Sequence, residues 1–166
     1  MARRRIDGVN DRTEPHLLGN PTQGLALKLA DFGRARTLAQ VMALLEGDAA
    51  LTAVFSRNLD WRLLAPLGRS QCRMIWDNQQ MVGFVTWANL DPDRAAALNA
   101  AEELRIETAD WSSGSQSWVV DAVILPGSEP ALARTFATLF PDGVEQFALG
   151  LNTWIRTGPA GIRAAQ

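Results

Sequence analysis

The sequence offers very little of the side-chain chemistry that disulfide and metal sites require. Cysteine and histidine occur once each, as Cys72 and His16. A single cysteine cannot form an internal disulfide, and one histidine cannot anchor a histidine-rich metal site. We therefore expect no metal site, no bound cofactor, a structural role for Cys72 and a reducing, cytoplasmic location.

Long apolar runs are also missing, and no segment approaches the length of a membrane-spanning helix. The arginines at positions 3–5 precede a polar stretch, so the N-terminus does not predict a secretory signal. The net charge is -2 and the other basic residues are scattered, which argues against general binding to nucleic acid or to an anionic membrane. The sequence also lacks the motifs typical of dinucleotide and NTP binding, serine hydrolases and zinc proteases.

The length of 166 residues predicts one domain with a substantial core. Residues 1–24 mix charged residues with Asn, Pro and Gly and show no periodicity, which predicts a flexible N-terminal arm. The domain is expected to occupy residues 25–166.

Hydrophobic periodicity within this domain predicts an α+β fold. Apolar residues recur at helical spacing in 36–46, and Asp48 and Asp91 are placed to cap helices that follow them. The segment 117–125 is a nearly continuous apolar run, typical of a strand covered on both faces. The expected order is helices at 36–46 and 48–58, an extended piece at 60–64, strands at 71–77 and 81–86, a helix that starts at Asp91-Pro92 and runs through 94–103, a loop at 110–116, a strand at 117–125, a helix at 129–140 and a final strand at 147–154. This order indicates a mixed, largely antiparallel sheet flanked by helices.

Aromatic usage is unusual, with six tryptophans and no tyrosine. Tryptophan contributes a large apolar area and one hydrogen-bond donor. We expect Trp61, Trp87, Trp111 and Trp118 to pack in the core or to form the walls of a pocket, with direct contact to a ligand as the alternative.

A single charge, Asp121, interrupts the apolar run at 117–125. Burying a carboxylate costs free energy unless it is paired or reaches a cavity. Burial also raises the pKa of a carboxyl group, which suits an acid or base near neutral pH. Asp121 is therefore the first catalytic candidate, and the alternative is a structural carboxylate bonded to a loop amide or an arginine.

Weaker candidates lie in the turns around this strand. Gly127 and Ser128 stand where a strand gives way to a helix, so backbone N–H groups there could bind an anion such as a pantetheine phosphate. Ser113 lies in the polar loop, where hydrogen bonding within the loop is the alternative to binding a substrate. Asn89 could cap the helix region near Asp91 or orient a substrate amide.

Several short motifs occur in a specific order between residues 38 and 140. They are Leu38-x-x-Val41-x-x-Leu44, Leu59-Asp60-Trp61, Pro66-Leu67, Gln71-x-Arg73, Trp87-Ala88-Asn89-Leu90, Asp110-Trp111-Ser112-Ser113-Gly114, Trp118-Val119-Val120-Asp121 and Gly127. In this order and spacing the sequence resembles the RTX toxin-activating lysine acyltransferases.

The resemblance implies a GNAT-like fold and a specific reaction. The donor would be acyl carrier protein, which carries the fatty acyl chain as a phosphopantetheine thioester, and the acceptor would be a lysine ε-amine. Asp121 falls on the catalytic aspartate of the family. The implied substrate-binding residues are Trp87, Asn89, Trp111, Ser113, Trp118, Gly127 and Ser128. The resemblance also implies that the chain can form a homodimer.

The family's catalytic histidine is missing, because the gapless match places Leu51 at its position. Three interpretations follow. Asp121 could act as the base, alone or through water; His16 could fold into the site from the arm; or the chain could be an inactive relative that binds acyl carrier protein or an acylated peptide. We favour the first, with a toxin or a small peptide precursor supplying a lysine or ornithine amine.

Overall fold

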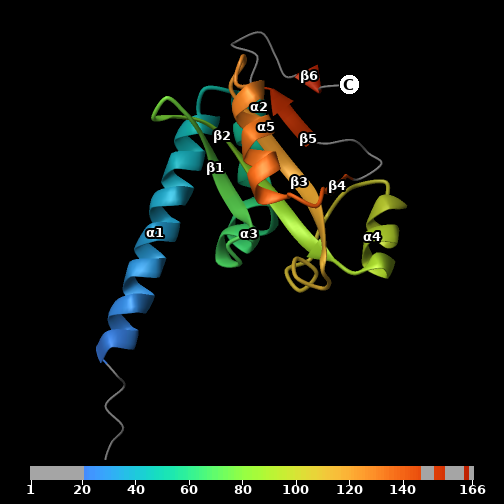
Figure 1. Ribbon diagram of the computed structural model, residues 1–166, viewed down its shortest axis with the longest axis horizontal. Helices are drawn as coiled ribbons and strands as arrows, with labels where there is room; N and C mark the ends of the chain where they lie inside the picture. Colours follow the sequence, from blue (N-terminus) through green and yellow to red (C-terminus); the bar gives the residue numbers. More distant parts are fainter. Residues whose placement is uncertain (1–20, 147–151, 156–162, 165–166) are drawn as a thin grey trace, which may run out of the picture.

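The computed structural model describes residues 21–146, 152–155 and 163–164, which form helices and one sheet (Figure 1). The helices are α1 (Pro21–Leu45), α2 (Ala49–Arg57), the π-helix η1 (Asp60–Leu64), α3 (Ala65–Gly68), α4 (Pro92–Asn99) and α5 (Glu129–Leu139). The strands are β1 (Cys72–Asp77), β2 (Gln80–Leu90), β3 (Gln116–Ile124), β4 (Glu145–Gln146), β5 (Asn152–Ile155) and β6 (Arg163–Ala164).

The sheet has the strand order β1-β2-β3-β5-β6, and β4 also pairs with β3. The pairs β1–β2, β2–β3 and β5–β6 are antiparallel, whereas β4 and β5 both run parallel to β3. The expected α+β fold with a mixed, largely antiparallel sheet is therefore confirmed. It places β3, the most apolar strand, between β2 and β5, where both of its edges are paired.

Helices cover both faces of the sheet. On one face, α1, α2 and η1 pack on β2 and β3 through a cluster that includes Val41, Phe55, Leu63, Phe84 and Val123. On the opposite face, Ala131 of α5 packs in a cluster with residues of β1, β2 and β3. Coverage on both faces explains why 117–125 reads as a nearly continuous apolar run.

Local sequence signals fixed most element ends correctly. Asp48 accepts hydrogen bonds from the backbone N–H groups of Ala50 and Leu51, and Asp91 accepts one from Arg94, so both predicted N-caps are confirmed. The turn between β1 and β2 has positive φ at Asn78 and Gln79. Two such residues are typical of a type I′ hairpin turn, whose twist matches that of the strands.

Several predicted boundaries were wrong. Residues 60–64, expected to be extended, form the π-helix η1, because they continue the helical path from α2 into α3. β2 runs on to Leu90 instead of ending at residue 86. The helix expected to start at Asp91-Pro92 and to run to residue 103 is α4, which begins at Pro92 as expected but ends at Asn99. Of the strand expected at 147–154, residues 152–154 lie in β5, and residues 147–151 lie outside the described part of the chain.

α1 is longer than the helix expected at 36–46, and it extends away from the sheet toward its N-terminal end (Figure 1). It includes residues 21–24, the last part of the predicted arm. Residues 1–20 lie outside the described part of the chain, so the division into arm and domain stays a prediction.

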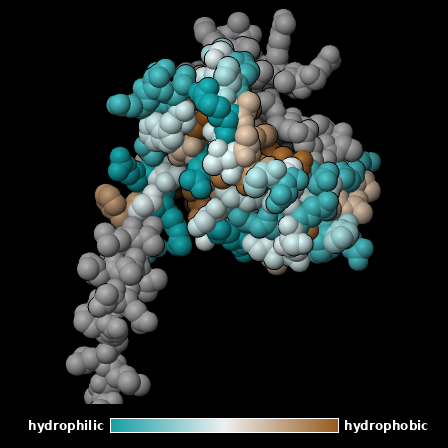
Figure 2. All heavy atoms as spheres, in the orientation of Figure 1, coloured by the Kyte–Doolittle hydropathy of each residue, from teal (hydrophilic) through white to brown (hydrophobic). Residues whose placement is uncertain are grey.

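The visible surface is mainly hydrophilic, with apolar side chains confined to small patches (Figure 2). Among the described residues, the exposed large apolar side chains are Phe32, Leu64 and Trp76. No helix in the described ranges is long and apolar enough to span a bilayer.

Candidate functional site

Asp121 lies on the central strand β3 at a β-bulge. In the β2–β3 ladder Thr86 is opposite Asp121, whereas the next residue, Trp87, is opposite Val119. Val120 is therefore the extra residue of the bulge. Bulges re-aim the side chains beside them, and this one puts both Val120 and Asp121 on the face covered by the N-terminal helices, because Val120 packs there with Trp61.

The partner of Asp121 is Arg62, at the centre of η1. The Nη1 atom of Arg62 donates a hydrogen bond to Oδ1 of Asp121. Asp121 is 0% exposed and Arg62 is 8% exposed, so the ion pair is buried. π-helical turns are rare and are often found at functional sites. Here the π-helix places Arg62 against the sheet, beside Asp121, which follows it by 59 positions in the sequence.

Aromatic rings complete the surroundings of Arg62. Its guanidinium carbon lies 4.4 Å from the centre of the Trp61 ring and 5.7 Å from that of Phe55. A cation over an aromatic face is attracted by the ring quadrupole, more so when it is desolvated. Arg62 was not predicted as a site residue. The signal available in the sequence was Asp121 itself, because a buried carboxylate calls for a basic partner.

The ion pair lies at the junction of two apolar core clusters. Trp61 and Val120 belong to the first cluster, and Leu63 and Val123 belong to the second. Arg62 therefore lies between the two clusters along η1, and Asp121 lies between them along β3. Thr86, opposite Asp121, is 0% exposed, and its hydroxyl has no hydrogen-bond partner among the described residues. Three polar side chains, one each from η1, β2 and β3, are thus enclosed by apolar side chains.

This geometry matches the structural alternative for Asp121, a carboxylate bonded to an arginine. The guanidinium of Arg62 donates to Oδ1 of this carboxylate, so that oxygen already has a hydrogen-bond donor. A fully buried carboxylate can also meet a substrate amine only through a change in its surroundings. The role of Asp121 as a base stays a prediction. It requires Asp121 to accept a proton despite its ion pair with Arg62.

Leu51, at the position where the resemblance places the family's histidine, is a core residue. It is 0% exposed and packs in the same cluster as Val41, Phe55, Phe84 and Val123. Asp48 binds its backbone N–H from the N-cap of α2. The position that would carry a proton acceptor is therefore part of the apolar packing between α2 and the sheet.

A hydrogen-bond network joins the motifs that carry the resemblance. Gln71 donates from Nε2 to the backbone oxygen of Trp111 at 2.8 Å, and its own backbone oxygen accepts from the N–H of Trp87 at 3.1 Å. The N–H of Asn89 donates to Trp111 O at 2.9 Å, and the N–H of Gly114 donates to Asn89 O at 3.0 Å. The loop at 110–114 is thereby fastened along the end of β2.

The side chains of Asn89 and Ser113 serve the same junction. Asn89 accepts a hydrogen bond from the Ser117 hydroxyl at Oδ1, so the helix cap comes from Asp91 and not from Asn89. Ser113 is exposed and its hydroxyl accepts from the backbone N–H of Asp91 at 3.3 Å. Both contacts hold the loop in place, and nothing in the structure tests their binding of a substrate.

The tryptophans are mainly core residues. Trp61, Trp111 and Trp118 are buried in one cluster. Trp87 is half-buried and packs edge to face against Phe140, with 5.6 Å between ring centres. Trp111 is 0% exposed and its indole N–H has no partner among the described residues. The predicted core role is confirmed for three of the four, and their contact with a substrate stays a prediction.

The turn after β3 offers fewer anion-binding donors than its sequence suggested. Gly127 has a φ of +81° and Ser128 is buried before α5. The N–H of Ser128 already donates to Leu125 O, and the N–H of Ala131 donates to Ser128 O. Pro130 has no N–H to contribute. The proposed phosphate contact at Gly127 and Ser128 must therefore use the few N–H groups that remain.

Cys72 does not supply a reactive nucleophile. Burial raises the pKa of its thiol to about 12, an effect larger than the opposing influence of the neighbouring Arg73. The thiolate is the nucleophilic form, and it is scarce near neutral pH at such a pKa. The described residues also contain no group of three metal-ligating side chains.

His16, the second catalytic candidate, lies outside the described residues, so its position relative to Asp121 is not established. A family model for the RTX toxin acyltransferase family matches residues 31–149. This range contains Leu51, Arg62, Asp121 and Gly127. No match was found among curated proteins.

Proposed function

Because the chain belongs to the RTX toxin acyltransferase family, we propose that it transfers a fatty acyl chain from acyl carrier protein to a lysine-type amine of a protein or peptide. The observation that carries this proposal is the family match over residues 31–149, which includes the whole of β1, β2, β3 and α5. A GNAT-like arrangement of these elements, a cytoplasmic location and a homodimer belong to the same proposal.

In the proposed reaction the neutral acceptor amine attacks the carbonyl carbon of the phosphopantetheine thioester. The tetrahedral intermediate collapses by breaking the C–S bond, which leaves an amide and the carrier thiolate. The nitrogen must lose one proton, which ends on the thiolate to give a free thiol. Asp121 is proposed to relay that proton, directly or through water, while hydrogen-bond donors stabilise the oxyanion. Attack of an amine on a thioester is not intrinsically difficult, so the main contribution of the protein is to position the two groups.

The Arg62–Asp121 ion pair limits how Asp121 can act. For Asp121 to take a proton, the Arg62 contact must loosen as the substrate amine arrives. The π-helix that carries Arg62 is a suitable element for this change, because its hydrogen bonding is less regular than that of an α-helix. Trp87, Asn89, Trp111, Ser113, Trp118, Gly127 and Ser128 are proposed to shape the substrate site around this step.

The second candidate function is a noncatalytic module that binds acyl carrier protein or an acylated peptide. Two observations favour it: Leu51 is part of the apolar core, and Asp121 is bonded to Arg62 inside the protein. Under this alternative the scaffold binds an acyl carrier or peptide without transferring the chain.

The test uses the full chain, acyl carrier protein loaded with a medium or long fatty acid, and candidate lysine or ornithine peptides, with mass spectrometry as the readout. We expect acylation by the wild type and a loss of about a hundredfold or more in Asp121→Asn. Asp93→Asn, a change at an exposed residue of α4, is the matched control and should keep full activity.

Three outcomes would change the proposal. Equal turnover by Asp121→Asn and wild type would remove Asp121 from the proton route. Loss of turnover in His16→Ala would move that role to His16. Failure to acylate any peptide, combined with stable binding of acyl carrier protein, would favour the noncatalytic module.

A further inference from the structure

β1 lies at one end of the sheet, and β6 lies at the other end, among the strands that the structure describes. Every second residue of a terminal strand directs its backbone N–H and C=O groups away from the sheet. Such an edge can accept one further strand from another chain. The backbone of β1 is therefore the first component of an interaction surface.

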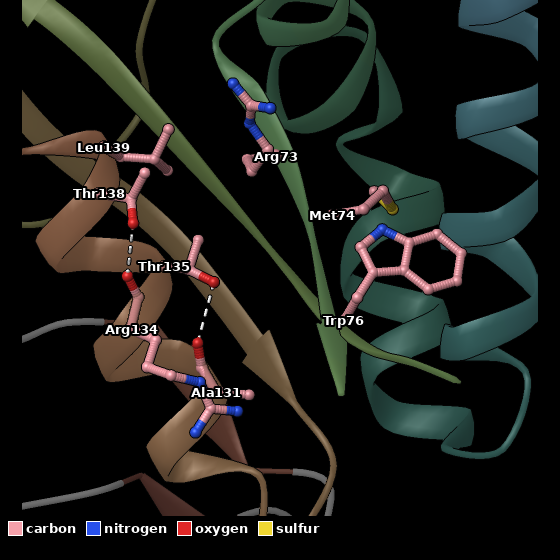
Figure 3. A pocket seen from close by; sticks show the side chains of 8 residues that line it. All are labelled: Arg73, Met74, Trp76, Ala131, Arg134, Thr135, Thr138 and Leu139. Carbon is pink, nitrogen blue, oxygen red and sulfur yellow. Dashed lines mark hydrogen bonds between the residues drawn. The ribbon is translucent and has the colours of Figure 1, made fainter. Parts of the chain in front are cut away.

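Grooves flank this edge on both faces of the sheet. The first, of about 440 Å³, lies between β1 and α5 and is lined by Arg73, Met74 and Trp76 together with Arg134, Thr135 and Leu139 (Figure 3). The second, of about 670 Å³, lies on the α1 side and is lined by the same three residues of β1 together with Gly33, Arg34 and Thr37. We call these the α5 groove and the α1 groove.

The position of the two grooves suits an added strand. Successive side chains of a strand point to opposite faces of the sheet. A segment paired with β1 would therefore place its side chains alternately in the α5 groove and in the α1 groove. Trp76 is 49% exposed and offers an apolar surface beside the edge.

The charge of the groove linings identifies the kind of segment that fits. The described linings contain Arg34, Arg73 and Arg134, and no aspartate or glutamate. Arg73 makes no ion pair with any described residue. Arg34 and Arg134 make only exposed pairs, with Asp31 at 3.4 Å and with Asp77 at 3.1 Å. Exposed pairs of this kind contribute little, so a carboxylate from another chain can replace them.

The threonines of α5 do not compete with the arginines as hydrogen-bond donors to a ligand. In Figure 3 the side chains of Thr135 and Thr138 are bonded to their own helix, donating to the backbone oxygens of Ala131 at 2.9 Å and of Arg134 at 3.0 Å. Their donors are used, so the arginines remain the groups that select an anion. The groove thus favours acidic side chains over neutral hydrogen-bond acceptors.

We infer that the edge of β1 binds an extended, acidic segment of a partner protein, which adds to the sheet as a strand and places carboxylates beside Arg73 and Arg134 in the α5 groove. The segment alternates acidic side chains with apolar ones, so its apolar side chains enter the α1 groove, where one packs on Trp76. This inference concerns binding alone, so it holds or fails independently of acyl transfer.

The test measures binding of a fluorescein-labelled peptide of about eight residues with alternating glutamate and valine, by fluorescence anisotropy on the full chain. We expect saturable binding that weakens as salt increases. Replacing glutamate by lysine in the peptide should abolish binding, and N-methylation of alternate peptide amides should weaken it strongly by blocking strand pairing.

Protein variants locate the site. Arg73→Glu should weaken binding by about tenfold or more, and Arg73→Gln by less, because the first adds repulsion to the loss of attraction. Arg105→Glu is the matched control, since Arg105 is exposed, pairs with Glu107 and lines neither groove. It should bind as the wild type does. Circular dichroism of each variant confirms that it is folded.

Several results would overturn the inference. They are an absence of binding to the wild type, equal binding of the lysine and glutamate peptides, unchanged binding in Arg73→Glu, and an equal loss in Arg105→Glu. Sedimentation provides the remaining outcome: a wild-type dimer that Arg73→Glu dissociates would show that a second copy occupies the edge, and the partner segment would be excluded.

Discussion

At the scale of single residues, the Arg62–Asp121 ion pair is the most consequential contact in the described core. The side chain of Arg62 is 10% exposed and that of Asp121 is 0% exposed, so their mutual attraction helps to offset the cost of burying two charges. The aromatic faces of Trp61 and Phe55 contribute a further attraction to the guanidinium but cannot replace the carboxylate.

Removing one member of this pair should therefore be severe. We expect Arg62→Ala to lower the free energy of unfolding by about 3–5 kcal/mol, because it leaves the Asp121 carboxylate buried without its cation. The double variant Arg62→Met with Asp121→Leu should lie closer to the wild type than Arg62→Ala does. Urea denaturation measures both. A loss below about 1 kcal/mol in Arg62→Ala would mean that the pair behaves as an exposed one.

At the scale of elements, the close approach of β2 to β3 depends on Gly83. A Cβ atom at this position would lie 2.3 Å from the backbone oxygen of Val123 and 2.9 Å from Cγ2 of Ile124. The first of these atoms belongs to the backbone, so the strands themselves would have to shift. The same two strands carry Thr86 and Asp121, which lie opposite each other farther along the ladder.

Gly83→Ala is accordingly expected to destabilise the protein by about 1–3 kcal/mol or more, through overpacking between strands. Gly68→Ala is the matched control, because no atom lies within 4 Å of the added carbon in α3 and alanine favours a helix. It should leave stability unchanged or raise it by less than about 1 kcal/mol. Similar thermal midpoints for the two variants would refute the argument from strand spacing.

At the scale of the whole molecule, the fold determines whether the family's histidine could be restored by one substitution. Leu51 of α2 belongs to a cluster with apolar residues of α1, η1 and the sheet. A histidine there would place a polar ring in an apolar cluster. Restoring a histidine at this position would therefore change the core packing as well as one residue type.

Leu51→His should lower the free energy of unfolding by about 2–5 kcal/mol, since it loses apolar packing and buries a polar ring. It should not increase acyl transfer. Leu51→Met, which nearly conserves volume, should cost less than about 1.5 kcal/mol. Chemical denaturation and the peptide acylation assay provide the two measurements. A stable Leu51→His with higher turnover would show that the position still faces the reacting groups.

Much of the fold could be predicted because its signals are local. The caps at Asp48 and Asp91 and the apolar run of β3 each depend on a few neighbouring residues, and the structure confirmed them. The extended piece predicted at 60–64 failed because the path of these residues depends on helical neighbours on both sides. Continuity of this kind is set by packing and leaves no periodic pattern in five residues.

The sequence by itself determined the α+β class, the family and the importance of Asp121, since a charge within an apolar strand is visible without a structure. Only the tertiary structure decided what Asp121 contacts. A bulge in β3 turns it toward the N-terminal helices, and a π-helix 59 positions earlier brings Arg62 to it. The grooves beside β1 likewise depend on which strand is terminal. Desolvation of a charge is a property of one residue, whereas its compensation depends on residues that only folding brings together.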